Sequence, residues 1–151
     1  MAPITLTPVS PADEQVQGLI SKLDAFQIEL YGRENCHLDS IQVLLKSGAH
    51  MLGAFDGTQL VGMGAVKIMG DYAEIKRMYV EENYRGQGIA ESILSQLEAH
   101  AQNQGLTQLY LETGVYHSAA QKLYLKLGYE VVEHFGDYPI TGLSVFMGKK
   151  L

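Results

Sequence analysis

A glycine-rich turn joins a strand directly to a helix in the middle of this 151-residue chain; residues 80–90 read VEENYRGQGIA. Gly86 and Gly88 let the backbone approach a ligand closely and adopt conformations that other residues avoid. The first N–H groups of the following helix have no helical partner and point out of its positive end. With Arg85 as a fixed cation beside them, these groups predict a phosphate-binding site.

Other phosphate-binding turns fit this segment less well. A P-loop is excluded because the pattern G-x-x-x-x-G-K-[ST] occurs nowhere in the chain. A dinucleotide-binding turn is disfavoured because Glu91 stands where a third small residue is needed, and because the preceding strands read as a hairpin meander. A tight turn that serves packing alone stays open as the alternative.

The periodicity of apolar residues predicts a mixed α/β fold in a single domain, residues 1–151. Asp56-Gly57 is a strong hairpin signal, so three successive antiparallel strands are expected around it. The expected strands are residues 4–7, 51–55, 59–69, 72–80, 106–112, 129–133 and 143–147, and the expected helices are residues 10–31, a short helix after residue 39, residues 88–104 and residues 118–127.

Capping signals locate the first two helices. Ser10 is the expected N-cap of the first helix and Pro11 its first helical residue. Asp39 or Ser40 is the expected cap of the second helix. The apolar face expected for the first helix comprises Val16, Leu19, Ile20, Leu23 and Leu30.

Composition and charge limit the compartments and the binding partners that are expected for this chain. The formal charge of −6 argues against a broad phosphate-binding face, so no nucleic-acid partner is expected. No apolar run approaches the ~18 residues of a membrane span, and the N-terminus lacks the pattern of a signal peptide. Cys36 is the only cysteine, and the five histidines show no metal-ligand spacing. We therefore expect a cytoplasmic protein that uses no metal and does not associate with membranes.

Two motifs resemble those of the GNAT superfamily of N-acetyltransferases. Residues 85–90, RGQGIA, match its coenzyme A loop, R/Q-x-x-G-x-G/A, and residues 119–129, AAQKLYLKLGY, resemble its A-x-x-L-Y-x-K-x-G-F/Y segment. The order of elements is similar to the GNAT fold from end to end. Ala90 replaces the commoner second glycine, which the pattern allows, whereas His117 stands where many members carry Asn. The resemblance implies an enzyme that transfers an acetyl group from acetyl-coenzyme A to an amine.

The same resemblance implies the residues that bind acetyl-coenzyme A. The pyrophosphate is expected at the loop, with a further contact from the start of the next motif helix. The residues concerned are Arg85, Gly86, Gln87, Gly88, Ile89, Ala90 and His117.

The strand before the loop supports this interpretation independently. Its apolar positions Ile75, Met78 and Val80 break strict alternation, and a β-bulge near Lys76-Arg77 would place all three on one face. GNAT enzymes have a similar bulge, which splays the fourth strand from the fifth in a mostly antiparallel sheet flanked by about four helices. The resemblance implies that backbone groups of the segment Met78-Tyr79-Val80 bind pantetheine, with an N–H near Met78 polarising the thioester. An irregular but purely structural edge is the alternative.

Three side chains are candidates for the chemistry. The resemblance assigns to Tyr124 the protonation of the leaving thiolate, since a phenol with a pKa of about 10 stays protonated at neutral pH. Glu74 is the first candidate for the base that deprotonates the acceptor, because a Glu at the start of this strand has that role in some GNAT members. Glu112 is the second candidate, although either carboxylate could be a solvated strand end. Many GNAT enzymes use water chains instead of a single base.

The acceptor is expected to be a small molecule with an amine and a carboxylate. The first two helices, which line the acceptor side in GNAT enzymes, meet around Tyr31, Arg33, Glu34 and His37. Arg33, with Lys76 and Arg77 on the neighbouring strand, offers cations suited to a carboxylate. Residues 135–138 and 144–147 resemble the endings of small bacterial GNAT enzymes, whose acceptors tend to be small molecules. A Lys or N-terminal protein acetyltransferase and a non-catalytic acyl-coenzyme A sensor are the alternatives, and a homodimer is compatible with the sequence.

Overall fold

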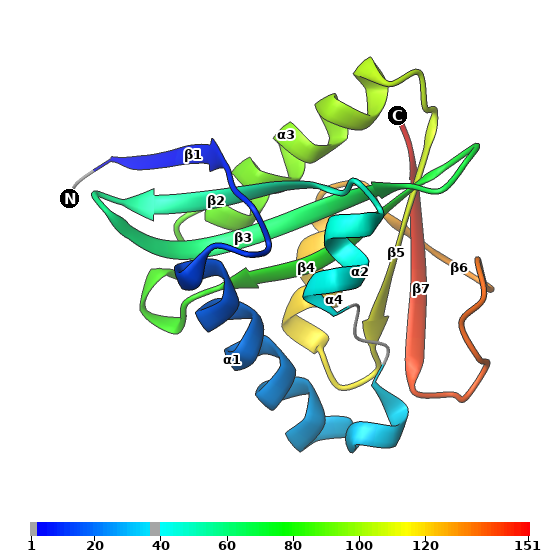
Figure 1. Cartoon of the computed structure of the whole chain (residues 1–151). Coiled ribbons are helices and arrows are strands. Elements are labelled where there is room, and N and C mark those ends of the chain that lie inside the picture. The colour runs from blue at the N-terminus through cyan, green and yellow to red at the C-terminus, as the bar shows by residue number, and fades with distance from the viewer. Residues whose placement is uncertain (1–2, 37–39) are drawn as a thin grey trace.

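A computed structural model describes residues 3–36 and 40–151, which form one seven-stranded sheet flanked by helices (Figure 1). The strand order is β1-β2-β3-β4-β5-β7-β6, and all neighbours are antiparallel except β4 and β5, which are parallel. This confirms the expected mixed, mostly antiparallel sheet. The strands are β1 Ile4–Pro8, β2 His50–Asp56, β3 Gln59–Ile68, β4 Ala73–Val80, β5 Gln108–Gly114, β6 Glu130–Val132 and β7 Ser144–Lys150.

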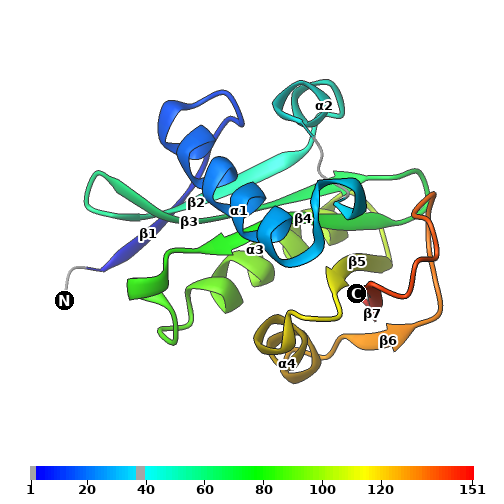
Figure 2. The same ribbon diagram turned by 90° about the horizontal axis from the view of Figure 1, so that it is seen from below.

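Helices cover both faces of the sheet. Figure 2 shows α1 and α2 on one face and α3 and α4 on the other. No helix in the described ranges is both long and apolar enough to cross a membrane. The helices are α1 Glu14–Tyr31, α2 Ile41–Lys46, α3 Ile89–Asn103 and α4 Ser118–Lys126, with short 3-10 turns η1 Arg33–Asn35 and η2 Glu82–Tyr84.

Two buried apolar clusters hold these helices to the sheet. Leu94 and Leu97 of α3, which are at most 1% exposed, belong to a cluster that also contains Tyr124 of α4. Val16 of α1 and Leu44 of α2, each 1% exposed, belong to the cluster on the other face. Burial of each such side chain contributes about 1.5–3 kcal/mol. The sheet is therefore packed on both sides, and its strand ends are positioned by both layers.

The start of α1 and one of its apolar positions differ from the prediction. The helix begins at Glu14 with Asp13 as N-cap, instead of with Ser10 as N-cap and Pro11 as its first residue. The Ser10 N–H donates to the Asp13 carboxylate at 3.0 Å, which holds the chain in a turn before the helix. Leu30 is 38% exposed, because it lies beyond the part of α1 that packs on the sheet. In α2 the cap is Ser40, whose Oγ accepts from Val43 N–H; Asp39 lies outside the described residues.

β4 carries the predicted bulge. Its pairing with β3 reaches Lys76 and resumes at Tyr79, so that Arg77 and Met78 together face the single residue Gly64. Arg77 has a φ of 59° and is the one non-glycine residue with positive φ in the described part of the chain. Two residues opposite one, with the first in the left-handed region, are the geometry of a β-bulge.

The bulge has the expected effect on side chains and on the sheet. Ile75, Met78 and Val80 all contact the apolar cluster on the α3 face. β4 pairs with β5 from Ala73 to Ile75 only, and within the described residues the two strands run on without pairing beyond that point. The predicted splay between the fourth and fifth strands is thus confirmed.

Gly64 makes room for the bulge, because an added Cβ would overlap the Met78 sulfur and lie 2.8 Å from the Cγ2 of Ile93. We expect Gly64→Ala to lower the free energy of unfolding by about 1–3 kcal/mol, as overpacking does. Gly18→Ala is the matched control: an added Cβ in this exposed position of α1 meets nothing within 4 Å, so the helix should gain about 0.5–1 kcal/mol. Urea unfolding measures both, and equal effects of the two substitutions would contradict the close packing at Gly64.

Candidate active site

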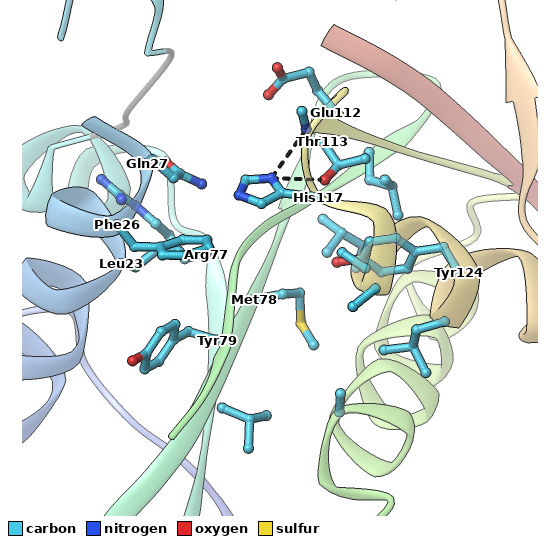
Figure 3. A pocket seen from close by; sticks show the side chains of 18 of the residues that line it. Leu23, Phe26, Gln27, Arg77, Met78, Tyr79, Glu112, Thr113, His117 and Tyr124 are labelled. Atoms are coloured by element: carbon cyan, nitrogen blue, oxygen red, sulfur yellow. Dashed lines mark hydrogen bonds between the residues drawn. The ribbon is translucent and has the colours of Figure 1, made fainter. Parts of the chain in front are cut away.

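The gap between the diverging ends of β4 and β5 opens into a cavity of about 780 Å³. Figure 3 shows Phe26 and Gln27 of α1 on one side and Tyr124 of α4 on the other, with His117 and Met78 between them. Ligand sites in proteins commonly measure roughly 300–1,000 Å³. The cavity can therefore hold a ligand in contact with β4, β5, α1, α3 and α4.

The glycine-rich turn lines this cavity at the start of α3. Gly86 and Gly88 have φ values of 78° and 80°, and an added Cβ at either would meet nothing within 4 Å. Gly88 is the N-cap of α3, so no capping side chain covers the first N–H groups of that helix. Arg85 Nε donates to the Val80 carbonyl at 2.9 Å, which holds the guanidinium beside the turn. Exposed N–H groups, a helix N-terminus and a cation together suit a pyrophosphate.

The structure brings the predicted coenzyme A residues together. Gln87 is the exception, since it is exposed and lies outside the cavity lining. Beyond Ile75 the β4 backbone has no β5 partner among the described residues, so its N–H and C=O groups on that side face the gap. The lining residues that were predicted are Arg85, Gly86, Gly88, Ile89, Ala90, Met78, Tyr79, Val80 and His117.

Tyr124 is held by burial at the inner wall of the cavity. It is 7% exposed, and its ring lies edge-on to that of Tyr129 with centroids 5.6 Å apart. Its hydroxyl points into the cavity (Figure 3). Burial raises the pKa of Tyr124 well above its ordinary value. The phenol therefore stays protonated at neutral pH and can donate a proton to a group bound in the cavity.

His117 precedes α4 and turns its ring toward α1. The Gly114 N–H donates to Nδ1 at 3.3 Å, so Nδ1 carries no proton. The ring stacks on Phe26 and meets Tyr31 edge-on, each with centroids 5.3 Å apart. Burial lowers the pKa of the imidazole, an effect opposed by the nearby Glu112 charge, and the neutral ring then carries its proton on Nε2. The His117 ring thus packs against side chains of α1 and not against the glycine-rich turn.

Two charged groups reach the cavity from the central strands. Arg77 is 9% exposed and extends toward α1, where its Nη1 donates to the Asp24 carboxylate. Glu112 of β5 accepts from the Ser144 hydroxyl at 2.7 Å. Both side chains line the cavity. A guanidinium and a carboxylate in one cavity can orient a small molecule that carries both an ammonium and a carboxylate group.

Comparison with known proteins agrees with this geometry. A model of the acetyltransferase (GNAT) family matches residues 16–129. The chain belongs to the GNAT family of acetyltransferases. It is 39% identical over 153 residues to the IAA acetyltransferase of Azospirillum brasilense, an alignment that covers 100% of both chains. It is 32% identical over 139 residues to the uncharacterized N-acetyltransferase YedL of Escherichia coli K12, covering 90% of this chain and 87% of that one.

Solved structures lead to the same family. A candidate acyl-CoA N-acyltransferase from Klebsiella pneumoniae superposes with a TM-score of 0.86 at 34% identity, covering 98% of this chain and 97% of that one. The PaiA N-acetyltransferase of Thermoplasma acidophilum, in complex with coenzyme A, has a TM-score of 0.75 at 23% identity, covering 99% of each chain. At 23% identity, the similarity to the PaiA enzyme supports the fold alone. The protein is thus an N-acetyltransferase of the GNAT type.

Besides Gln87, two of the predicted site residues of this GNAT enzyme lie outside the cavity lining. Arg33 is exposed, because α1 ends at Tyr31 with Gly32 as its C-cap, and the turn η1 carries the side chain to the surface. Glu74 is buried at 3% exposure, and the Tyr138 hydroxyl donates to its carboxylate. His37, also expected near the acceptor, lies outside the described residues.

Several lining residues of the GNAT enzyme were not identified from its sequence. Phe26 is 45% exposed at the cavity, and Tyr116 also lines it. Tyr31, which was expected near the acceptor, accepts a hydrogen bond at 2.9 Å from the Tyr116 N–H. Tyr138, between β6 and β7, also lines the cavity. The one available signal for Tyr138 was the resemblance of residues 135–138 to the endings of small bacterial GNAT enzymes.

Cys36 lies in the cavity wall, but it is not suited to carry an acyl group. Its Sγ donates to the Gly32 carbonyl at 3.2 Å. Burial, with smaller contributions from the charges of Asp24, Glu112 and Glu34, raises the pKa of the thiol. The thiol therefore stays protonated and is a weak nucleophile. Over the described ranges, no group of three or more His, Cys, Asp and Glu side chains could hold a metal ion.

Proposed function

We propose that this enzyme transfers the acetyl group of acetyl-coenzyme A to the amine of a small-molecule acceptor by direct attack, with both substrates bound together. The supporting observation is that one cavity contains the uncapped start of α3, the unpaired stretch of β4 and the Tyr124 hydroxyl. The same cavity thus offers a binding site for phosphate, a strand edge for an extended ligand chain, and Tyr124 as a proton donor. Release of coenzyme A thiol from acetyl-coenzyme A, measured with a panel of small amines, tests the proposal.

Each part of acetyl-coenzyme A has a matching part of the cavity. Arg85 and the N–H groups at Gly88 and after it would hold the pyrophosphate. Backbone groups from Met78 to Val80 would bind pantetheine as an added strand. An N–H near Met78 would donate to the thioester carbonyl, where negative charge develops during attack. Acetyl-coenzyme A itself supplies the activated acyl group.

Gly88→Val tests the pyrophosphate site. Acetyl-coenzyme A at 100 times its Kd should stabilise the wild type by ~2.7 kcal/mol, visible as a thermal shift. The valine side chain would occupy the space of the phosphate, so this shift should be lost. Gly105→Val is the matched control, since Gly105 also has a positive φ, 83°, with nothing within 4 Å of an added Cβ, but lies beyond the other end of α3. Loss of the shift in both variants, or in neither, would contradict the assignment.

Tyr124 would act as the acid when the carbon–sulfur bond breaks. The hydroxyl donates its proton to the leaving thiolate, and the high pKa caused by burial ensures that the proton is present at neutral pH. The ring is fixed against Tyr129, so the hydroxyl needs no rearrangement to reach the cavity. Retention of this residue favours an enzyme over a non-catalytic sensor of acyl-coenzyme A.

We expect Tyr124→Phe to lower kcat by about 10²-fold, the low end of acid catalysis, because a thiolate is already a good leaving group. The thermal shift with acetyl-coenzyme A should persist, since the ring and its packing remain. Tyr129→Phe is the matched control: it removes a buried hydroxyl that bonds to Glu98 and lies outside the cavity lining, so kcat should not change. Equal kcat for Tyr124→Phe and the wild type, with chemistry rate-limiting, would remove Tyr124 from the mechanism.

A small acceptor that carries a carboxylate fits the charges around the cavity. Arg77 presents a buried guanidinium suited to a carboxylate, while Glu112 can attract the ammonium. The relative named IAA acetyltransferase, 39% identical over the whole chain, is consistent with a small acceptor. A Lys-rich protein tail would instead favour an acidic groove without a buried cation at its floor.

Arg77→Lys tests the carboxylate contact, because Lys keeps the charge beside Asp24 but loses the planar fork. We expect KM for an amino-acid acceptor to rise by about 10-fold, as for one lost charge-assisted hydrogen bond. KM for the corresponding decarboxylated amine and for acetyl-coenzyme A should not change. Arg33→Gln, outside the lining, should leave all three constants unchanged. Preferred turnover of polyamines or Lys-rich peptides would show that the acceptor class is wrong.

A further inference from the structure

A buried carboxylate lies just behind the cavity wall and is hydrogen-bonded to a tyrosine that lines the cavity. The Glu74 side chain is 4% exposed and lies outside the cavity lining. The Tyr138 hydroxyl donates to its Oε2, and Tyr138 does line the cavity. A ligand in the cavity can therefore contact Tyr138, whereas Glu74 is not among the lining residues. Glu74, the base expected from the sequence, is thus linked to the cavity by the Tyr138 hydroxyl.

Lys76 completes this arrangement with a positive charge. Its Nζ donates to the Tyr138 hydroxyl oxygen at 2.6 Å and lies 3.5 Å from Glu74 Oε2. The Lys76 side chain is 10% exposed and also lines the cavity. The ammonium stabilises negative charge on the phenol oxygen as its proton shifts toward Glu74. It also disfavours a second ammonium close by, so an acceptor amine near Tyr138 loses its proton more readily.

Ring packing fixes Tyr138 in this position. Its ring lies edge-on to Phe135 with centroids 5.5 Å apart and is tilted against Phe146 at 6.0 Å. The His134 ring bonds to the Tyr138 carbonyl at 2.6 Å, which closes the turn around it. Phe135 in turn stacks on Tyr110 of β5 at 4.9 Å. The loop between β6 and β7 thus holds the hydroxyl against β4 before any substrate binds.

We propose that Tyr138 and Glu74 form a proton relay that deprotonates the acceptor, with Lys76 as the positioning cation. The inference rests on the acetyl transfer proposed above. The acceptor ammonium gives a proton to the Tyr138 oxygen while the Tyr138 proton passes to Glu74 Oε2. The freed amine forms the bond to the acetyl carbon, and the carbon–sulfur bond breaks. The thiolate takes its proton from Tyr124, which regains one from the second proton shed by nitrogen. Glu74 returns its proton through the Tyr138 hydroxyl to solvent in the cavity.

Other titratable groups pack around the relay but are placed differently. Tyr72, before β4, has its pKa raised by burial and then by the charges of Glu74, Asp137 and Asp71. His134 contacts the backbone of Tyr138 and not its hydroxyl. Glu112 is the rival base, because it lines the cavity directly.

The pH dependence of kcat/KM separates a relay from a structural role. At pH 7 we expect Tyr138→Phe, which keeps the ring packing, to lower kcat/KM for the acceptor by about 10²-fold. The deficit should shrink by about tenfold per pH unit toward the pKa of the acceptor, where free amine is abundant. Glu74→Gln should show the same profile. The double variant should be no worse than either single variant, because both remove one relay.

Two controls make the outcome decisive. Tyr110→Phe removes a hydroxyl from the same aromatic cluster outside the cavity lining and should match the wild type at every pH. Glu112→Gln, if Glu112 holds the ammonium, should raise KM without the pH-dependent recovery. A loss for Tyr138→Phe that is equal at all pH values, no loss at all, or recovery with pH in Glu112→Gln alone would each overturn the relay. Acetyl transfer by the wild type is read in the same assay, so its absence would count against the proposed function instead.

Discussion

Backbone hydrogen bonding at the β4–β5 boundary determines most of this structure. A buried strand must pair its N–H and C=O groups, and unpaired groups are costly unless water or a ligand takes the place of the missing strand. β4 pairs with β5 over Ala73 to Ile75 and then diverges. The bulge at Arg77 and Met78 produces this divergence by turning the strand, at the cost of a left-handed conformation at Arg77. The cavity, its exposed backbone and the direction of Arg77 toward α1 all follow from that one irregularity.

The bulge also explains why α1 belongs to the site. In a regular strand, the side chains of Lys76 and Arg77 would point to opposite faces of the sheet. The extra residue of the bulge instead turns the Arg77 side chain toward Asp24 of α1. This ion pair balances the charge of a nearly buried guanidinium at the edge of the cavity. From there α1 continues to Phe26 and Tyr31, whose rings contact His117 before α4. Elements from opposite faces of the sheet thus meet where the two strands part.

Local signals in the sequence predicted most helices and strands. The predicted bounds were wrong where a local side-chain hydrogen bond or packing against distant residues determined the structure. The broken alternation at Ile75, Met78 and Val80 predicted the bulge. In a regular strand these three apolar side chains could not all point to the same face of the sheet, so a local irregularity was needed. The turn and helix after Arg85 were predictable for the same reason. The start of α1 was not, because the Ser10 bond to Asp13 competes with helix capping.

The candidate site was predictable where a motif is contiguous and not where residues meet through the fold. Glu74 and Tyr138 are 64 residues apart, and no periodicity indicates that the loop between β6 and β7 lies against β4. Arg33 seemed suited to the acceptor because it follows α1, but the direction of a side chain in a 3-10 turn depends on how the preceding helix ends. Such placements depend on tertiary packing, which the sequence does not display.

The two carboxylates near the cavity show why placement matters more than residue type. Glu112 meets the cavity directly and is bonded to the Ser144 hydroxyl, a neutral donor, so it can attract a cation. Glu74 lies behind Tyr138 and beside Lys76, so it does not line the cavity, and in the proposed relay a proton reaches it through the phenol. One environment suits binding of an ammonium, and the other suits removal of its proton.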